Sequence, residues 1–158
     1  MPILTMCIYA ALLSFEAHAP HPIHEQSLGY QIKWSKRQLG LRVGECLLIH
    51  RDARRAKVNF HWGLATAITE SGLDPGKVSS KGARSSMQTY KRYVCKGCTL
   101  RLGGLKAAER LRTAHGFCDG AAKYNAGNRG SCEGLGSGYA SRLIEIYLRL
   151  LEYEIENL

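Results

Sequence analysis

Apolar side chains recur at helical spacing in three parts of the chain. The longest stripe lies near the C-terminal end, at positions i, i+4, i+7, i+8, i+11 and i+12: Tyr139, Leu143, Ile146, Tyr147, Leu150 and Leu151. This pattern predicts a long amphipathic helix that covers the core. A second helix is predicted over residues 105–115, bounded by Gly103-Gly104 on one side and by Gly116 on the other.

The third predicted helix has clear start and stop signals. Its apolar positions are Phe60, Leu64, Ala67 and Ile68. Asn59 is a suitable N-cap, Gly72 is a suitable C-terminal stop, and Pro75 cannot continue the helix. Glu70 therefore lies in the last turn, where the helix dipole disfavours negative charge. A carboxyl placed there, beside apolar neighbours, tends to keep its proton at neutral pH, as a general acid must.

The basic residues 20–57 have an ambiguous pattern. Leu39, Leu41 and Val43 alternate as in a strand, whereas Leu39, Val43, Cys46 and Leu47 fit a helix equally well. Two glycines, Gly40 and Gly44, weaken both interpretations. We expect an irregular N-terminal extension that packs on the core.

A short helix is expected between the two long ones. Asp119 is a candidate N-cap, Gly127 is a candidate stop, and the helix would carry Tyr124 and Asn125. The glycine-rich residues 128–138 are predicted to form a loop.

Composition indicates one basic globular domain. The chain has 158 residues, 45% of them hydrophobic, which suffices for a core of its own. The formal net charge is +9. A basic protein is attracted to acidic polymers, such as nucleic acid or the bacterial cell wall. The basic residues are scattered rather than gathered beside a nucleic-acid reader motif, so we expect no nucleic-acid partner.

Residues 1–19 have the pattern of an export signal. No charged side chain precedes Glu16, residues 3–15 are mostly apolar, and Ala17-His18-Ala19 has the small-any-small form of a cleavage site. The apolar run is too short to span a membrane, which takes about 20 residues. We therefore expect a signal peptide and a periplasmic or secreted protein. The alternatives are a buried N-terminal helix and an uncleaved tether.

Five short segments follow Asn59 in an informative order. They are Glu70-Ser71, Ser79 before Gly82-Ala83, Met87-Gln88, residues 122–127 (Ala-Lys-Tyr-Asn-Ala-Gly) and residues 139–143 (Tyr-Ala-Ser-Arg-Leu). Together, over roughly residues 58–150, they resemble the goose-lysozyme-like lytic transglycosylases, and in particular the soluble lytic transglycosylase domain. Ser85-Ser86 stands where that family has Gly-Leu, and Lys123 stands where it has a small apolar residue.

The resemblance implies a fold and a reaction. The fold would be mainly α, of the lysozyme-like α+β kind, with a compact helical catalytic domain at residues 58–158 after a signal at 1–19 and an extension at 20–57. Glu70 would protonate the oxygen that links N-acetylmuramic acid to N-acetylglucosamine. It would then accept a proton from the muramoyl C6 hydroxyl as that hydroxyl attacks C1, which gives a 1,6-anhydro sugar. No cofactor and no metal ion are expected.

Positions that match the family's motifs supply the substrate-binding residues. Ser79 and Gln88 would hydrogen-bond the sugar, and Tyr124 would orient Glu70 or the acetamido group. Asn125 would shape the pocket floor, and Met87 would form an apolar wall or simply pack in the core.

Three neighbouring residues are expected to have structural roles. Ser71 would make a helix-end hydrogen bond, and Asp74 would cap a turn before Pro75. His61 is one step off the apolar stripe of its helix, which is typical of a partly exposed structural histidine.

The cysteines leave alternatives open. Cys95, Cys98, Cys118 and Cys132 flank the motifs, and an oxidising compartment favours disulfides among them. The Cys95–Cys98 spacing also fits half a zinc site or a redox dithiol, and free thiols are a further alternative. Removal of the leader with Cys7 would leave five cysteines, and so at least one unpaired thiol. The repeat of His18, His21 and His24 is expected to be a solvated segment rather than a metal site.

Three rival functions have distinct signatures. A hydrolytic lysozyme would cut the same bond with water, activated by Asp74. A wall-binding module without turnover would not need Glu70. A zinc-stabilised nucleic-acid protein would explain charge and cysteines, but not the order of the motifs. Phage lysis, a secretion or conjugation assembly, and wall turnover all fit the expected partner, the peptidoglycan glycan strand.

Overall fold

The structure is a computed structural model that describes residues 2–18 and 28–158. Its helices are α1 (Ile3–His18), α2 (Leu28–Ala56), α3 (Phe60–Ser71), α4 (Leu100–His115), α5 (Phe117–Ala126) and α6 (Ser137–Glu156), with short 3₁₀ helices η2 (Lys91–Tyr93) and η3 (Gly127–Arg129). The described residues contain two isolated β-bridges, Val78–Arg84 and Arg84–Thr89, and no strand. The mainly α class and the long C-terminal helix are confirmed.

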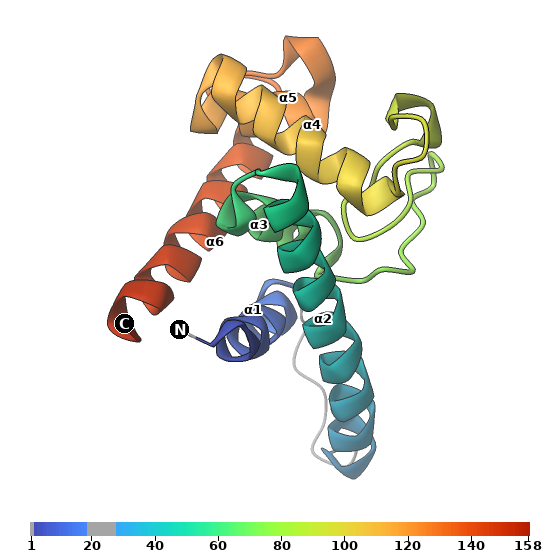
Figure 1. The fold of residues 1–158 in the computed structure, drawn as a ribbon, viewed down its shortest axis with the longest axis vertical. Coiled ribbons are helices and arrows are strands. Elements are labelled where there is room, and N and C mark those ends of the chain that lie inside the picture. The colour runs from blue at the N-terminus through green and yellow to red at the C-terminus, as the bar shows by residue number, and fades with distance from the viewer. Residues whose placement is uncertain (1, 19–27) are drawn as a thin grey trace.

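Helix α3 lies in the middle of the molecule and contacts α1, α2, α4 and α6 (Figure 1). Every residue from Trp62 to Ile68 is buried, as expected for a helix that other elements surround on all sides. The Trp62 ring packs edge-on against Phe117 of α5 and Tyr147 of α6. Its indole N–H donates to the Ala108 carbonyl of α4, at 3.3 Å. One tryptophan thus joins four helices.

Helix α2 resolves the ambiguous N-terminal pattern. Residues Leu28–Ala56 form one long helix, so both the strand and the irregular extension are wrong for this segment. Gly40 and Gly44 lie inside it, and open space surrounds the positions where their Cβ atoms would be. They lower the helix propensity without serving a close contact, which is why they obscured the pattern. Cys46, Ile49 and Ala53 pack in the core.

Helix α1 belongs to the same core. Its buried residues include Met6, Cys7, Ala10 and Leu13. Cys7 is bonded to Cys46 of α2, and the Tyr9 ring stacks on Tyr153 of α6 with the centroids 4.0 Å apart. The segment with the pattern of an export signal therefore forms a helix here that buries one face in the core, whereas Leu4, Ile8 and Leu12 are exposed. Of the helices that the structure describes, none is long and apolar enough to cross a membrane.

Two predicted helix boundaries are wrong. Helix α4 begins at Leu100 after the N-cap Thr99, so Gly103 and Gly104 lie inside it. A side chain on Gly104 would collide with Met87 and Thr89, so this glycine allows a close approach rather than ending the helix. Helix α5 begins after Gly116, and Asp119 lies in its first turn instead of capping it.

The predicted C-terminal end of the short helix and the predicted loop after it agree better with the structure. Gly127 ends α5, as predicted, although η3 follows at once within the loop. The Asp119 carboxylate accepts a hydrogen bond from the Cys132 backbone N–H at 2.8 Å, which fixes that loop against α5.

All six cysteines are paired, as Cys7–Cys46, Cys95–Cys98 and Cys118–Cys132. The disulfides expected among the last four are confirmed. In this chain, which retains Cys7, that residue pairs with Cys46; an unpaired thiol is expected only after removal of the leader, and that expectation stays a prediction. No cluster of three or more metal-binding side chains occurs among the described residues. His21, His24 and the side chain of His18 lie outside the described part.

Candidate active site

Glu70 projects from a helix end that the local sequence defines. The Asn59 side chain accepts a hydrogen bond from the Trp62 backbone N–H at 2.9 Å and so caps the start of α3. At the other end, Gly72 is left-handed with φ +64°, and its N–H donates to the Ile68 carbonyl at 2.8 Å. Both caps agree with the sequence prediction. They place Glu70 in the last turn, one residue before the final helical position.

The Glu70 carboxyl is in a largely desolvated position. Burial raises the pKa of Glu70 above its ordinary value, because the charged form loses more solvation than the neutral form. The Tyr139 hydroxyl opposes this effect, as do the charges of Lys77 and Arg142, but they do not cancel it. A carboxyl with a raised pKa holds its proton closer to neutral pH and can donate it to a leaving group.

Two tyrosine hydroxyls lie beside this carboxyl. Tyr139, at the start of α6, interacts with Glu70 and has no further hydrogen-bond partner among the described residues. Tyr124, in α5, donates to the Met87 carbonyl at 2.7 Å. Burial, and then the charge of Glu70, raise the pKa of both tyrosines, so both hydroxyls stay protonated. The carboxyl thus has two neutral hydroxyls beside it, and among the described residues it forms no salt bridge.

The segment after α3 folds back onto the site. The Lys77 ammonium donates to the backbone carbonyl of Glu70 at 2.7 Å. The Gln88 side-chain N–H groups donate to the carbonyls of Lys77 at 3.0 Å and Ser85 at 2.9 Å. Gln88 therefore uses its donors to shape this segment.

The remaining predicted residues have different environments. Met87 is fully buried in the core cluster, so the core-packing interpretation describes its side chain. Ser79 closes a turn, because its hydroxyl oxygen accepts from the Ala83 N–H at 3.0 Å. Asn125 is exposed on α5. The structure thus links Tyr124 to Glu70 directly and Gln88 to Glu70 through Lys77, and the sugar-binding roles of Ser79, Gln88, Tyr124 and Asn125 all stay predictions.

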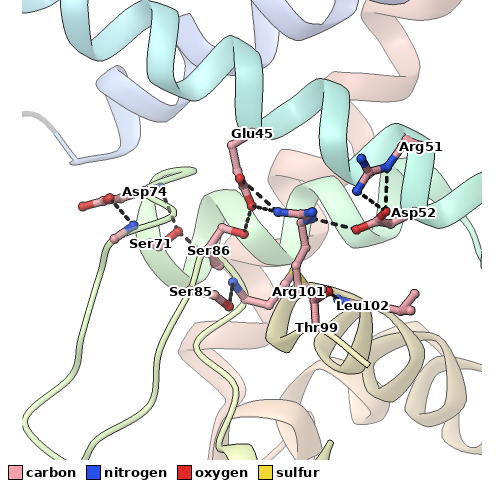
Figure 2. A network of polar contacts seen from close by, with 12 residues as sticks. Glu45, Arg51, Asp52, Ser71, Asp74, Ser85, Ser86, Thr99, Arg101 and Leu102 are labelled. Carbon is pink, nitrogen blue, oxygen red and sulfur yellow. Dashed lines mark hydrogen bonds and ion pairs between the residues drawn. The ribbon is translucent and has the colours of Figure 1, made fainter. Parts of the chain in front are cut away.

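A second group of polar side chains, most of them buried, surrounds Arg101 and includes Ser86 of the Ser85–Gln88 turn (Figure 2). We call it the Arg101 network; its members are Glu45, Arg51, Asp52, Ser86 and Arg101. The Arg101 guanidinium donates to Asp52 at 2.8 Å and to both oxygens of Glu45 at 3.4 Å. The Ser86 hydroxyl donates to Glu45 at 2.6 Å. Helix α2 is thereby joined to α4 and to the turn.

The Arg101 network also reaches the residue next to the candidate acid. The Ser71 hydroxyl donates to the Ser86 carbonyl at 2.8 Å and lies 3.0 Å from the Ala67 carbonyl. The same oxygen accepts from the Asp74 N–H at 3.1 Å. This confirms the helix-end hydrogen bond expected of Ser71. Asp74 in turn accepts from the Gly76 N–H at 2.9 Å and caps the turn around Pro75.

Ser85-Ser86 lies in a turn with an unusual backbone. Ser85 has φ +73°, in the left-handed region that favours glycine. Ser86 is fully buried and satisfied by Glu45. The turn thus combines a left-handed backbone at Ser85 with a buried polar anchor at Ser86.

Sequence analysis missed three residues of this site. Tyr139 was identified as an apolar position of the last helix, and its place in the Tyr-Ala-Ser-Arg-Leu segment was the signal for a second role. Arg142 belongs to the same segment, whereas Lys77 carried no local signal, because its effect depends on how distant segments pack.

The arrangement can hold a proton on a desolvated carboxyl and deliver it to a nearby acceptor. No protein-family model matches this chain, and comparisons with curated proteins and with solved structures find no match.

Proposed function

We propose that this protein is a peptidoglycan lytic transglycosylase with a lysozyme-like fold. The observation that carries the proposal is Glu70, a carboxyl at the end of the central helix with a pKa raised by burial. The order of the flanking motifs supports it, since Gln88, Tyr124 and Tyr139 come from three of them and lie around the same helix end.

In this proposal Glu70 acts twice. It first protonates the glycosidic oxygen between N-acetylmuramic acid and N-acetylglucosamine. As the carboxylate, it then removes the proton of the muramoyl C6 hydroxyl while that oxygen attacks C1. The bond from C1 to the leaving sugar breaks, the C1–O6 bond forms, and no water is consumed. A nucleophile held within the substrate can act at an effective molarity of about 10⁵ M or more.

The neighbours of Glu70 have roles that fit this sequence of steps. The neutral Tyr139 hydroxyl and the positive charges of Lys77 and Arg142 stabilise the carboxylate that exists between the two proton transfers. The Gln88 amide oxygen would accept from a sugar hydroxyl. Ser79 and Asn125 are proposed to contact the glycan farther from the reacting bond.

A hydrolytic lysozyme is the second candidate function. It needs a base that activates water, and Asp74 is the nearest carboxylate in the sequence. Asp74 already accepts the Gly76 N–H and holds a turn, which favours the transglycosylase. A binding module without turnover is favoured less. Burial of the Glu70 carboxyl lowers the stability of the fold, and a protein that only binds the wall does not need such a group.

The proposed setting is the bacterial envelope, outside the cytoplasm. Three disulfides and the wall substrate support a periplasmic or secreted protein that serves phage lysis, a secretion or conjugation assembly, or wall turnover. Export with cleavage after Ala19 would remove α1, whereas export as an uncleaved chain would keep the Cys7–Cys46 bond. N-terminal sequencing of the exported protein distinguishes these two routes.

Product analysis tests the proposed reaction. Purified sacculi are incubated with the protein, and the released muropeptides are analysed by mass spectrometry. We expect 1,6-anhydro-muramoyl ends, lighter by one water than lysozyme products. Reducing ends alone would make the protein a hydrolase, and the absence of any cleavage would leave the binding module.

A further inference from the structure

A cavity of about 770 Å³ lies beside the Cys95–Cys98 disulfide. Its wall is formed by three residues between 82 and 89, by Lys91 and residues 94–98, and by Thr99 and Leu100 at the start of α4. This volume is within the range of sites for small ligands, roughly 300 to 1,000 Å³. The cavity is distinct from the surroundings of Glu70, which does not line it.

The charge of the cavity wall is entirely positive. Arg84, Lys91 and Lys96 line it, and no Asp or Glu does. None of these three cations forms an ion pair within the described residues. In this they differ from Arg101 and Arg112, whose guanidinium groups are bonded to carboxylates. Uncompensated cations around a hollow attract and hold anionic groups.

Hydrogen-bond donors add to this preference for an anion. Thr89 and Thr99 line the same wall. Thr99 also caps α4, a helix of 16 residues whose first turn faces the cavity at Leu100. The positive end of the helix dipole therefore adds to the field of the three cations.

The loop that carries the lysine side chains is held in shape locally. The disulfide joins Cys95 to Cys98, and the Cys98 N–H donates to the Cys95 carbonyl at 2.9 Å. Val94, just before the disulfide, packs against Gly103 of α4 so closely that a Cβ at Gly103 would overlap it. A preformed wall reduces the entropy lost when a ligand binds.

Backbone hydrogen bonds connect the cavity to the candidate active site. Arg84 and Thr89 exchange N–H to carbonyl bonds of 3.1 and 2.9 Å, which close the turn that carries Met87 and Gln88. The Met87 carbonyl accepts the Tyr124 hydroxyl. A ligand held in the cavity would thus be fixed to the same turn that shapes the surroundings of Glu70.

We infer that this cavity binds the acidic peptide attached to the wall glycan, through the carboxylates of that peptide. The inference rests on the proposed function for its substrate. Three cations spread over the wall suit a short chain with several carboxylates, whereas one phosphate group would meet only part of such a wall. The cavity would therefore make peptide-bearing glycan a better ligand than bare glycan.

Binding of a defined fragment tests this inference independently of cleavage. The probe is a disaccharide–peptide with free carboxylates, and calorimetry measures its Kd. The test variant replaces Arg84, Lys91 and Lys96 by Gln. The control replaces three exposed cations that do not line the cavity, Lys57, Lys106 and Arg110, by Gln and so changes the net charge equally.

We expect the test variant to lose roughly tenfold or more in affinity, given the strength of charge-assisted hydrogen bonds, whereas the control keeps the wild-type Kd. Amidation of the peptide carboxylates should produce the same loss with the wild-type protein. Equal losses in the two triple variants, or no effect of amidation, would overturn the inference. Binding of a wall phosphate polymer in preference to the disaccharide–peptide would also overturn it.

Cleavage of peptide-free glycan separates this inference from the proposed function. If the wild type and the test variant cut bare glycan at equal rates while their affinities for the disaccharide–peptide differ, both the proposed reaction and the cavity inference are supported. If bare glycan is cut but the affinities do not differ, the cavity inference alone is wrong. If no glycan of either kind is cut, the proposed reaction is wrong, and the Kd values still decide what the cavity binds.

Discussion

Two carboxylate sites are connected to the Ser85–Gln88 turn, and the pKa values of their acids are shifted in opposite directions. In the Arg101 network, Asp52 receives hydrogen bonds from Arg51 and Arg101 at 3.0 and 2.8 Å. Burial raises the pKa of Asp52, but those hydrogen bonds and charges outweigh it, so the pKa is lowered. At Glu70 the balance goes the other way, and the pKa is raised.

The difference comes from the partners rather than from burial itself. Asp52 meets guanidinium groups at hydrogen-bond distance, which stabilise the charged form. Glu70 meets the tyrosine hydroxyl of Tyr139, and the Lys77 ammonium is bonded to its backbone carbonyl instead of its carboxylate. A buried acid that is fully paired holds a fold together, whereas one left with neutral neighbours keeps a proton that it can transfer.

Removal of the Glu70 carboxyl should have the largest effect. Glu70→Gln keeps the shape but cannot transfer a proton, so we expect wall cleavage to fall by about 10² to 10⁴, roughly 3 to 5 kcal/mol of barrier. The turbidity of a sacculus suspension follows the rate, and circular dichroism follows the fold. Glu133→Gln, an exposed acid in the loop before α6, is the matched control and should cut like the wild type. Clearing by Glu70→Gln at the wild-type rate would end the assignment.

Arg101→Met should break the paired site. It leaves Glu45 and Asp52 buried without their shared cation, which typically costs about 3 to 5 kcal/mol of unfolding free energy. Chemical denaturation measures the loss. Arg110→Met, an exposed position on the same helix, should stay within about 0.5 kcal/mol of the wild type.

Neutralising the carboxylates as well should recover part of that stability. In the triple variant Glu45→Gln, Asp52→Asn and Arg101→Met, the uncompensated charges are gone. A triple variant as unstable as Arg101→Met would mean that the loss comes from packing and not from charge.

The two acids should give opposite dependences of stability on pH. The lowered pKa of Asp52 means that its contribution is present above its ordinary value of 3.8 and is lost as the pH falls through the folded-state pKa. The raised pKa of Glu70 means that its contribution is present below its ordinary value of 4.5 and is lost as the pH rises through the folded-state pKa.

Unfolding free energies over a pH series check both signs. Relative to the wild type, Glu70→Gln should gain stability as the pH rises above about 4.5, the ordinary value of a glutamate. Asp52→Asn should approach the wild type as the pH falls below about 3.8. Parallel curves for the wild type and Glu70→Gln would show that the Glu70 pKa is the same in the folded and unfolded chains.

Substitutions in and beside the Ser85–Gln88 turn should have the smallest effect on the free energy of unfolding. Ser85→Gly relieves a left-handed non-glycine residue but makes the unfolded chain more flexible, so we expect a net gain of about 0.5 kcal/mol. Gly82→Ala, at φ +84° in the same segment, is the reverse substitution and should lose about 1 kcal/mol. Thermal unfolding of both variants provides the comparison. A loss in Ser85→Gly would mean that the contact of its side-chain oxygen with the Met87 N–H, at 3.3 Å, matters more than the backbone.

Sequence reasoning succeeded where the signal is local. Asn59 and Gly72 cap α3 through bonds that span at most five residues, so their identities sufficed. It failed where a residue serves a distant contact. Gly104 looked like a helix boundary because its reason, the close approach of Met87 and Thr89, comes from another segment. Glu45 and Asp52 carried no pattern, since Arg101 lies 49 positions beyond Asp52.

The three disulfides differ in how far they restrict the unfolded chain. Cys7–Cys46 spans 39 positions, Cys118–Cys132 spans 14, and Cys95–Cys98 spans 3. Loop-closure entropy gives about 4 kcal/mol for the first and about 3 kcal/mol for the second, and the least for the third. The first two bonds thus exclude many unfolded conformations. Cys7–Cys46 joins α1 to α2, and Cys118–Cys132 joins α5 to the loop before α6. Cys95–Cys98 excludes few unfolded conformations, so its main effect is local: it fixes the shape of one wall of the cavity.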